Sequence, residues 1–146
     1  ICIMATLKVT IKEELVLNGK DVGNDNYISI AGVNNAEHKI IDVGTGEQSL
    51  LLFDTAIAAG TYADNTVKHL RLTNLDDTNF IQLRLVGGTT QYYAKLEPKE
   101  TFILGNSKLY ADATGTSATE SFINIDSMHV KADTAACELE VFIATS

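Results

Sequence analysis

Residues 67–104 constrain the fold of this chain more than any other stretch, because they consist of four short runs of alternating apolar residues joined by turns. The runs are Val67–Thr73, Phe80–Val86, Tyr92–Leu96 and Thr101–Leu104, and the turns between them are Asn74–Asn79, Gly87-Gly88 and Glu97–Glu100. Apolar residues at every second position predict half-buried strands. Short strands with turn residues at this spacing are typical of an all-β sandwich or barrel.

The rest of the chain continues this pattern. Leu7, Val9 and Ile11 alternate with polar residues, and Asn18-Gly19 is a strong hairpin signal after an apolar run. Further strands are expected at Tyr27–Ile30, Lys39–Val43, Ser49–Phe53, Ser121–Ile125, Met128–Ala132 and Glu138–Ile143, and loops at Ala56–Tyr62 and Ala111–Thr119. We therefore predict an all-β protein, a jelly-roll-like β-sandwich of about ten short antiparallel strands. We expect a single domain over residues 1–146, with residues 1–6 as an extended N-terminal arm.

The composition suits a globular domain that folds without a metal or a disulfide. Hydrophobic residues make up 45% of the 146 residues and charged residues 21%. A chain of this length can bury roughly 68–70% of its unfolded surface. No run approaches the ~18 apolar residues of a membrane span. The apolar Ile1-Cys2-Ile3 is too short for a signal peptide and has no basic n-region. As a separate hypothesis, Met4 is the start and the three residues before it belong to a longer reading frame.

The net charge of −8 disfavours nucleic acid and anionic membranes as primary partners, because both are themselves negatively charged. The eleven basic residues are scattered rather than clustered. Cys2 and Cys137 lie near opposite ends of the chain and have no metal-type spacing. We expect two reduced thiols, with a bridge only if the terminal strands are neighbours.

No catalytic motif is present: the sequence has no GxSxG elbow, no HExxH and no GxxxxGK[ST] loop. His38, His69 and His129 are isolated in the sequence, and the last two lie in predicted strands beside lysines. The favoured interpretation for each is a solvated or hydrogen-bonded imidazole rather than a metal ligand or a general base. We therefore predict no enzyme activity, no catalytic residue, no cofactor and no metal site.

Two loops carry oxygen ligands that calcium could use. One holds Asp76, Asp77 and Asn79, and the other holds Asp21 with Asn24–Asn26. Neither matches the alternate spacing of an EF-hand loop. Side chains of Asp and Asn in turns usually bond their own backbone, and we expect that role here.

Aromatic residues offer candidate interfaces. Tyr92 and Tyr93 point to opposite faces of one strand, so at most one of them can join a sugar-stacking platform, and core packing or a subunit contact is favoured. Phe142 shares its strand face with Glu138 and Glu140. A large apolar side chain on a polar face indicates a subunit contact, unless the strand is central and covered on both faces. The predicted interface residues are Phe142, Tyr92 and Tyr93.

Three segments resemble a pattern found in small structural proteins of tailed bacteriophages, particularly marine ones. The pattern is an Asn-Leu-Asp-x-Thr-Asn-Phe turn between strands, a Lys-Leu-x-Pro/Ala-Gly/Lys-Glu/Ser turn and a terminal strand after Ala-Asp-Thr-Ala-Ala. It matches Thr73–Phe80, Lys95–Glu100 and Ala132–Val141 in the C-terminal half, and the N-terminal half more loosely. Pro98-Lys99-Glu100 stands where such proteins often have Pro-Gly-Glu, so the turn type there is open.

The resemblance implies a β-sandwich virion component, assembled in the host cytoplasm. We expect a capsid decoration, cement or head-fibre module that self-associates, with a trimer as the expected form, and that binds the major capsid protein or another virion protein. A carbohydrate- or receptor-binding module of the phage tail is the alternative, although the chain has no Trp. A depolymerase is a third reading, and a chain of this length without an evident acid pair disfavours it.

Overall fold

The computed structural model describes residues 4–54, 61–63, 66–104, 110–111 and 123–146. It contains strands and turns, and no helix in these residues is long and apolar enough to cross a membrane. The chain forms two compact units, Ile1–Asn34 and Asn35–Ser146, and the first strands pair with each other as a hairpin. A single domain over residues 1–146 stays a prediction. The predicted extended segment 1–6 overlaps the first strand, which begins at Ala5.

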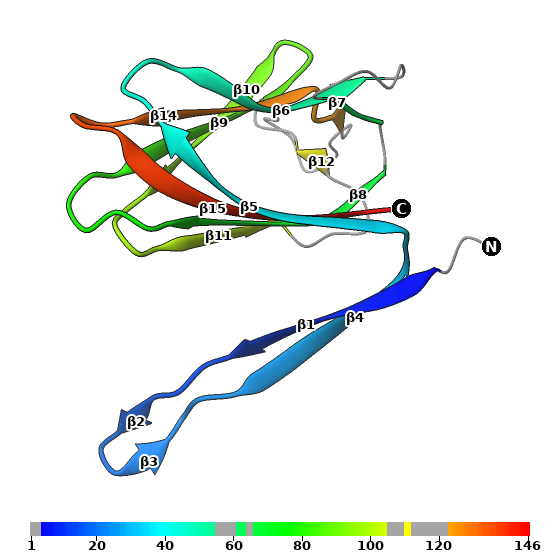
Figure 1. The fold of residues 1–146 in the computed structure, drawn as a ribbon. Helices are drawn as coiled ribbons and strands as arrows, with labels where there is room; N and C mark the ends of the chain where they lie inside the picture. The colour runs from blue at the N-terminus through cyan, green and yellow to red at the C-terminus, as the bar shows by residue number, and fades with distance from the viewer. Residues whose placement is uncertain (1–3, 55–60, 64–65, 105–109, 112–122) are drawn as a thin grey trace. The chain divides into compact units, whose positions relative to one another are not determined.

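The first unit is a two-stranded antiparallel ribbon, which we call the arm (Ala5–Val33). Strand β1 (Ala5–Lys12) pairs with β4 (Asp25–Val33), and the short strands β2 (Val16–Leu17) and β3 (Lys20–Asp21) continue the ribbon to its tip (Figure 1). Asn18 and Gly19 both have positive φ angles, 51° and 76°. This is the geometry of a type I′ hairpin turn, which confirms the hairpin signal of the Asn-Gly pair.

A glycine allows the two sides of the hairpin to approach closely near the tip of the arm. A Cβ atom at Gly23 would overlap the carbonyl oxygen of Glu13. The amide of Glu13 donates to the carbonyl of Asn24 at 2.8 Å, so the ladder continues through this point. Only a residue without a side chain fits here.

The second unit is a β-sandwich of two packed sheets (Figure 1). One sheet has the order β11-β8-β15-β5 and the other β10-β9-β14-β6-β7. The strands of the first sheet are β5 (Asn35–Val43), β8 (Val67–Asn74), β11 (Thr101–Leu104) and β15 (Cys137–Thr145). Those of the second are β6 (Gln48–Asp54), β7 (Thr61–Ala63), β9 (Ile81–Gly87), β10 (Thr90–Leu96) and β14 (Ser127–Ala132). The short pair β12 (Tyr110–Ala111) and β13 (Ile123–Asn124) completes the strands of the described residues.

The strand order is that of a jelly roll. When the eight strands of four or more residues in Asn35–Ser146 are counted along the chain, one sheet reads first-eighth-third-sixth and the other second-seventh-fourth-fifth. The pairs β9–β10, β8–β11, β6–β14 and β5–β15 are nested antiparallel pairs around the turn at Gly88-Thr89. A long hairpin wound into two sheets gives this arrangement, and it confirms the predicted jelly-roll-like fold.

The core lies between the two sheets and follows the predicted alternation. Leu70 and Leu72 of β8 and Ile81, Leu83 and Leu85 of β9 are at most 4% exposed. The intervening residues Arg71, Gln82 and Arg84 are only partly buried, as period two requires. The other members of the core cluster are Val43, Leu51, Val67, Leu96, Ile125, Met128, Val130, Ala132, Cys137, Leu139, Val141 and Ile143.

The Asn74–Asn79 turn is a hydrogen-bonded corner between strands. The buried Asn74 accepts a bond from the amide of Asp76 at 3.0 Å and donates to the carbonyls of Asn79 and Leu96 at 2.9 and 3.1 Å. The Asp76 carboxylate accepts the amides of Thr78 and Asn79 at 3.2 and 2.8 Å. The predicted backbone role of these side chains is therefore confirmed.

Lys99 settles the turn type that the sequence left open. Its φ is 66°, and the amide of Glu100 donates to the carbonyl of Glu97 at 3.1 Å. A positive φ at the third position of such a turn is the type II geometry that usually takes glycine. The Lys99 ammonium bonds the Leu75 carbonyl and pairs with Asp77 at 2.8 Å, contacts that a glycine could not make.

Candidate interaction surfaces

Phe142 lies on the outer face of the sheet formed by β11, β8, β15 and β5. It shares this face with Glu138 and Glu140, as predicted, because β15 keeps period two. The side chain is half-buried, since its ring meets His69 edge-on with the centroids 5.9 Å apart. Two exposed apolar residues of the neighbouring strands share the face, Ile40 at 56% and Ile103 at 40%.

An ion network lies beside Phe142. Glu140 pairs with Arg71 across the sheet, and its second oxygen is 3.3 Å from His38 Nε2. The hydrogen bond from Arg71, with a smaller one from His38, lowers the pKa of Glu140 below its usual value. Arg71 also donates to Thr73 Oγ1 at 2.8 Å. The face thus combines apolar side chains with paired charges, the mixture found at protein–protein contacts.

His69 is the buried histidine of the described chain. It is 3% exposed although it lies on the face opposite the core, and its Nδ1 has no hydrogen-bond partner among the described residues. Burial, with repulsion from Arg71, lowers the pKa of His69. The prediction of a solvated or hydrogen-bonded imidazole is therefore wrong for Nδ1 of His69.

Tyr92 and Tyr93 lie on opposite faces of β10, as predicted. Tyr92 stands opposite Leu85 on the core side, yet it is 47% exposed because β10 is the edge strand of its sheet. Tyr93 stands opposite Arg84 on the outer face and is 56% exposed. Its hydroxyl donates to Gln91 Oε1 at 3.0 Å. The structure therefore separates the two tyrosines from each other and from Phe142, which lies on the other sheet.

The outer face around Tyr93 carries a polar cluster drawn from several strands. Arg84 bonds both carboxylate oxygens of Glu47, and this pairing lowers the pKa of Glu47. His129 lies between two hydroxyls, with Nε2 2.9 Å from Ser127 Oγ and Nδ1 3.4 Å from Ser49 Oγ. Sequence reasoning missed this cluster because its members are up to 80 residues apart and meet only through strand pairing. It can accept and donate hydrogen bonds over a flat sheet surface.

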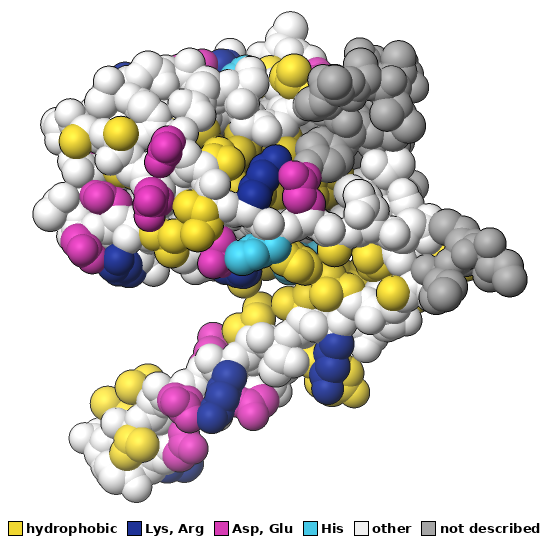
Figure 2. All heavy atoms as spheres, in the orientation of Figure 1, with side chains coloured by type: hydrophobic (Ala, Val, Ile, Leu, Met, Phe, Trp, Pro, Cys, Tyr) yellow, Lys and Arg dark blue, Asp and Glu magenta, His cyan; other side chains and the backbone are white. Residues whose placement is uncertain are grey.

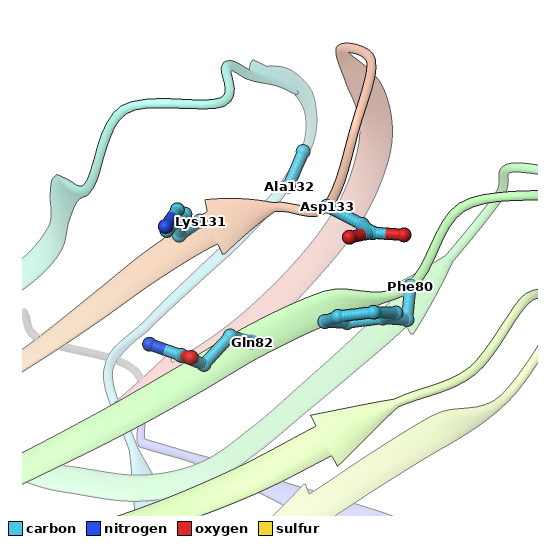
Figure 3. Close-up of a pocket in the computed structure, with 5 residues that line it drawn as sticks. All are labelled: Phe80, Gln82, Lys131, Ala132 and Asp133. Carbon is cyan, nitrogen blue, oxygen red and sulfur yellow. The ribbon is translucent and has the colours of Figure 1, made fainter.

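A small pocket lies at the end of the same sheet (Figure 3). Phe80, Gln82, Lys131, Ala132 and Asp133 line about 70 Å³, and Figure 3 shows Gln82 and Lys131 on adjacent strands. Small-molecule sites generally have volumes of 300–1,000 Å³. The pocket can therefore hold water or one group of a larger ligand.

The two loops considered for calcium use their side chains internally. In the arm, Asp21 Oδ1 accepts the amide of Gly23 at 2.9 Å and Asn26 Oδ1 accepts the amide of Tyr27 at 2.9 Å. Backbone amides of Asn79 and Thr78 lower the pKa of Asp76 in the other loop. Within the described residues, no group of three His, Cys, Asp or Glu side chains is arranged to hold a metal ion.

The arm carries the largest set of exposed apolar residues. Leu15, Val16, Leu17 and Val22 form an apolar tip, each with at least 50% of its surface exposed. Figure 2 shows hydrophobic side chains at this tip and along the ribbon, with charged side chains between them. The alternation of Leu7, Val9 and Ile11 predicts a strand, which we expect within the sandwich. Pairing of β1 with β4 places them in a two-stranded ribbon instead.

Comparison with protein-family models, with curated proteins and with solved structures finds no match for this chain.

Proposed function

We propose that this chain is a non-enzymatic structural component of a tailed-phage virion, and that it works by self-association and by contact with another virion protein. The observation that carries the proposal is the arm, a two-stranded ribbon with exposed apolar residues. A ribbon of this kind is marginally stable by itself in water, so it needs a partner surface. The type of particle, a tailed-phage virion, is inferred from the sequence segments that resemble phage structural proteins.

The fold supports the proposal as an analogy. Jelly rolls build viral capsid proteins, and they also build lectins, so the fold by itself does not choose between these roles. The hydrogen-bonded corner at Asn74 and the ion network at Glu140 have structural roles in this proposal rather than catalytic ones. In this proposal the chain decorates or cements the capsid, or forms a head fibre, and associates as a homo-oligomer with a trimer as the expected form.

The first test is the mass of the full chain in solution. Sedimentation at concentrations well above micromolar should give a homo-oligomer, and the chain should occur at a fixed copy number in purified particles of the phage that encodes it. A monomer that is absent from the particles would refute the proposal.

Phe142→Asp tests the predicted contact at the Phe142 face. An unpaired charge in a buried contact is strongly unfavourable, so the variant should associate at least tenfold more weakly while its β-rich circular dichroism stays unchanged. Gln82→Asp, on the outer face of the other sheet, is the matched control. If Phe142→Asp leaves the oligomer unchanged, the contact lies elsewhere.

A carbohydrate- or receptor-binding module is the second candidate. The supporting observation is the outer face around Tyr93, where an exposed aromatic ring lies among Arg84, Gln91 and His129. Carbohydrate-binding sites commonly combine an aromatic ring with hydrogen-bonding side chains. A glycan array that shows binding, and loss of that binding in Tyr93→Ala, would favour this function.

A further inference from the structure

One face of the arm is apolar except at Asn26. The register pairs Leu7 with Ile30, Val9 with Ile28 and Ile11 with Asn26. Cross-strand partners in an antiparallel pair share a face, so the five apolar side chains line one side of the ribbon. We call this set, Leu7, Val9, Ile11, Ile28 and Ile30, the apolar face of the arm.

The opposite face of the arm is polar. It pairs Lys8 with Ser29, Thr10 with Tyr27 and Lys12 with Asp25. The Lys8 ammonium lies 4.6 Å from the centre of the Tyr27 ring. A ribbon that is apolar on one side and polar on the other is built to lie against something on its apolar side.

That apolar side is only partly covered. Ile11 is 45% exposed and Ile28 is 46% exposed. Full burial of one such side chain is worth about 1.5–3 kcal/mol, so the exposed face favours association. Two strands give the ribbon no second layer of its own.

Charge favours another copy of the arm as the occupant. Residues 1–34 hold three lysines and four acidic residues, a net charge of −1, which leaves −7 for Asn35–Ser146. Contact between two arms meets less charge repulsion than a contact between sandwich units such as the one proposed at the Phe142 face, so the arms can contribute the larger share of the association. Identical apolar faces are also self-complementary about a symmetry axis.

The area of the face indicates how many arms meet. The fourteen residues from Ala5 to Asn18 span about 45 Å and two strands are about 10 Å wide, so a whole side of the ribbon covers about 450 Å². The apolar face from Leu7 to Ile11 spans about 16 Å and covers roughly 160 Å² of this side. Two arms in contact along this whole side would bury about 900 Å² in total, below the ~1,200 Å² of a standard stable interface. Three arms around one axis each contact two neighbours, which brings the tip residues and the strand edges into the contact as well.

We infer that the arms of neighbouring copies pack together through their apolar faces and hold the homo-oligomer together. This rests on the proposed function, because it names the surface through which the chain self-associates. The contact buries Val9, Ile11 and Ile28 between copies and leaves Thr10 and Lys12 in water. The partner is a second copy of this chain.

Cross-linking at single cysteines tests the contact on the full chain. Sheets that pack face to face are about 10 Å apart, too far for a direct disulfide, so the probe is a short bis-maleimide linker. In a Cys2→Ser background, Val9→Cys or Ile28→Cys should yield at least fivefold more linked dimer than Thr10→Cys on the polar face. Cys137 is buried, and the background protein without an added cysteine is the control for it.

A charge variant supplies an independent measurement. The double variant Ile11→Glu, Ile28→Glu should associate at least tenfold more weakly in sedimentation, while Thr10→Glu, on the same strand, should associate as the unmodified chain does. Thermal melting of the sandwich unit checks that the variants remain folded.

The outcomes separate this inference from the proposed function. An oligomer that links equally through Val9→Cys and Thr10→Cys, or through neither, would overturn the arm contact and leave self-association intact. A monomer would overturn both. If the chain is a monomer and the double glutamate variant has a lower melting temperature, the arm packs on its own chain. If the chain is a monomer that associates only with an added virion protein, the apolar face binds that protein.

Discussion

Asn74 and His69 are both buried polar residues of β8, and they differ in their hydrogen bonds. The side-chain oxygen and nitrogen of Asn74 both form hydrogen bonds, whereas His69 Nδ1 has no hydrogen-bond partner in the described chain. A paired buried group adds little cost, while an unpaired one costs about 1–3 kcal/mol. His69 is therefore a residue whose environment penalises the charged form of its ring.

Stability should fall in mild acid because of His69. Burial lowers the pKa of His69 in the folded state, while the unfolded chain takes up a proton near pH 6.5. The unfolded state then binds more protons below pH 6.5, so the stabilisation that is complete above this pH is lost as the pH falls towards the folded pKa. Urea unfolding at pH 7.5 and at pH 5.5 should show a higher midpoint at pH 7.5.

His69→Phe is the matched variant for this effect. It keeps a ring beside Phe142 and removes the titration, so its unfolding midpoint should change less between the two pH values than that of the unmodified chain. An equal pH dependence in the variant and the unmodified chain would exclude His69 as its source.

At the scale of single elements, strand register and corner geometry decide what is buried. In β9, the residues alternate without exception between buried and partly buried, because both neighbours of the strand, β10 and β14, continue the sheet. In β10, the same alternation leaves Tyr92 exposed, because one edge of this strand has no neighbour in its sheet. The position of a strand within its sheet thus controls burial as much as its sequence does.

Leu83→Ala should destabilise the sandwich by about 2–5 kcal/mol, the range for large-to-small changes in a core. Leu83 is fully buried at the centre of β9. Denaturant unfolding measures the change, and Gln82→Ala on the outer face should cost less than about 1 kcal/mol. A loss below about 1 kcal/mol for Leu83→Ala would mean that the core does not close over this strand.

Asn74→Ala should cost about 1–3 kcal/mol, because it leaves the amide of Asp76 and the carbonyl of Leu96 without a bond. Thr78→Ala, at the exposed end of the same turn, is the control. Addition of a chelator should leave the melting temperature of the unmodified chain unchanged. A melting temperature that falls on chelation and returns with calcium would instead identify the turn as a metal site.

At the scale of the whole molecule, the acidic charge opposes the association that the apolar surfaces favour. The net charge of −8 acts between any two copies in solution, and salt screens it over about 10 Å at 0.1 M. The sheet orders leave edge strands at β5, β7, β10 and β11, which also offer their backbones to other chains. Assembly is therefore a balance between apolar contact and charge repulsion.

Raising the salt concentration from 0.05 to 0.5 M should strengthen the homo-oligomer. Screening weakens the repulsion between acidic copies, while contact between apolar faces is little affected by it. Sedimentation velocity across a salt series measures the change in association. Dissociation of the oligomer by salt would show that ion pairs, rather than apolar faces, hold the copies together.

The sequence by itself determined the local features of this fold. Period-two alternation placed Leu70, Leu83 and their neighbours in the core, and the Asn18-Gly19 pair identified the hairpin turn. These signals are short-range, because a side chain alternates across its own strand and a turn depends on its own φ angles. For the same reason, the opposite orientations of Tyr92 and Tyr93 could be predicted.

Only the tertiary structure decided which strands are neighbours. The edge-on contact of His69 with Phe142 and the cluster around His129 both depend on contacts between residues far apart in the chain. The arm is a local hairpin, but only the structure shows that its strands pair with each other and, among the described residues, with no strand of the sandwich. Leu7, Val9 and Ile11 look alike in the sequence whether they face a second sheet or line a ribbon of two strands. Long-range pairing is set by the free energy of the whole assembly of strands, and no local pattern carries that information.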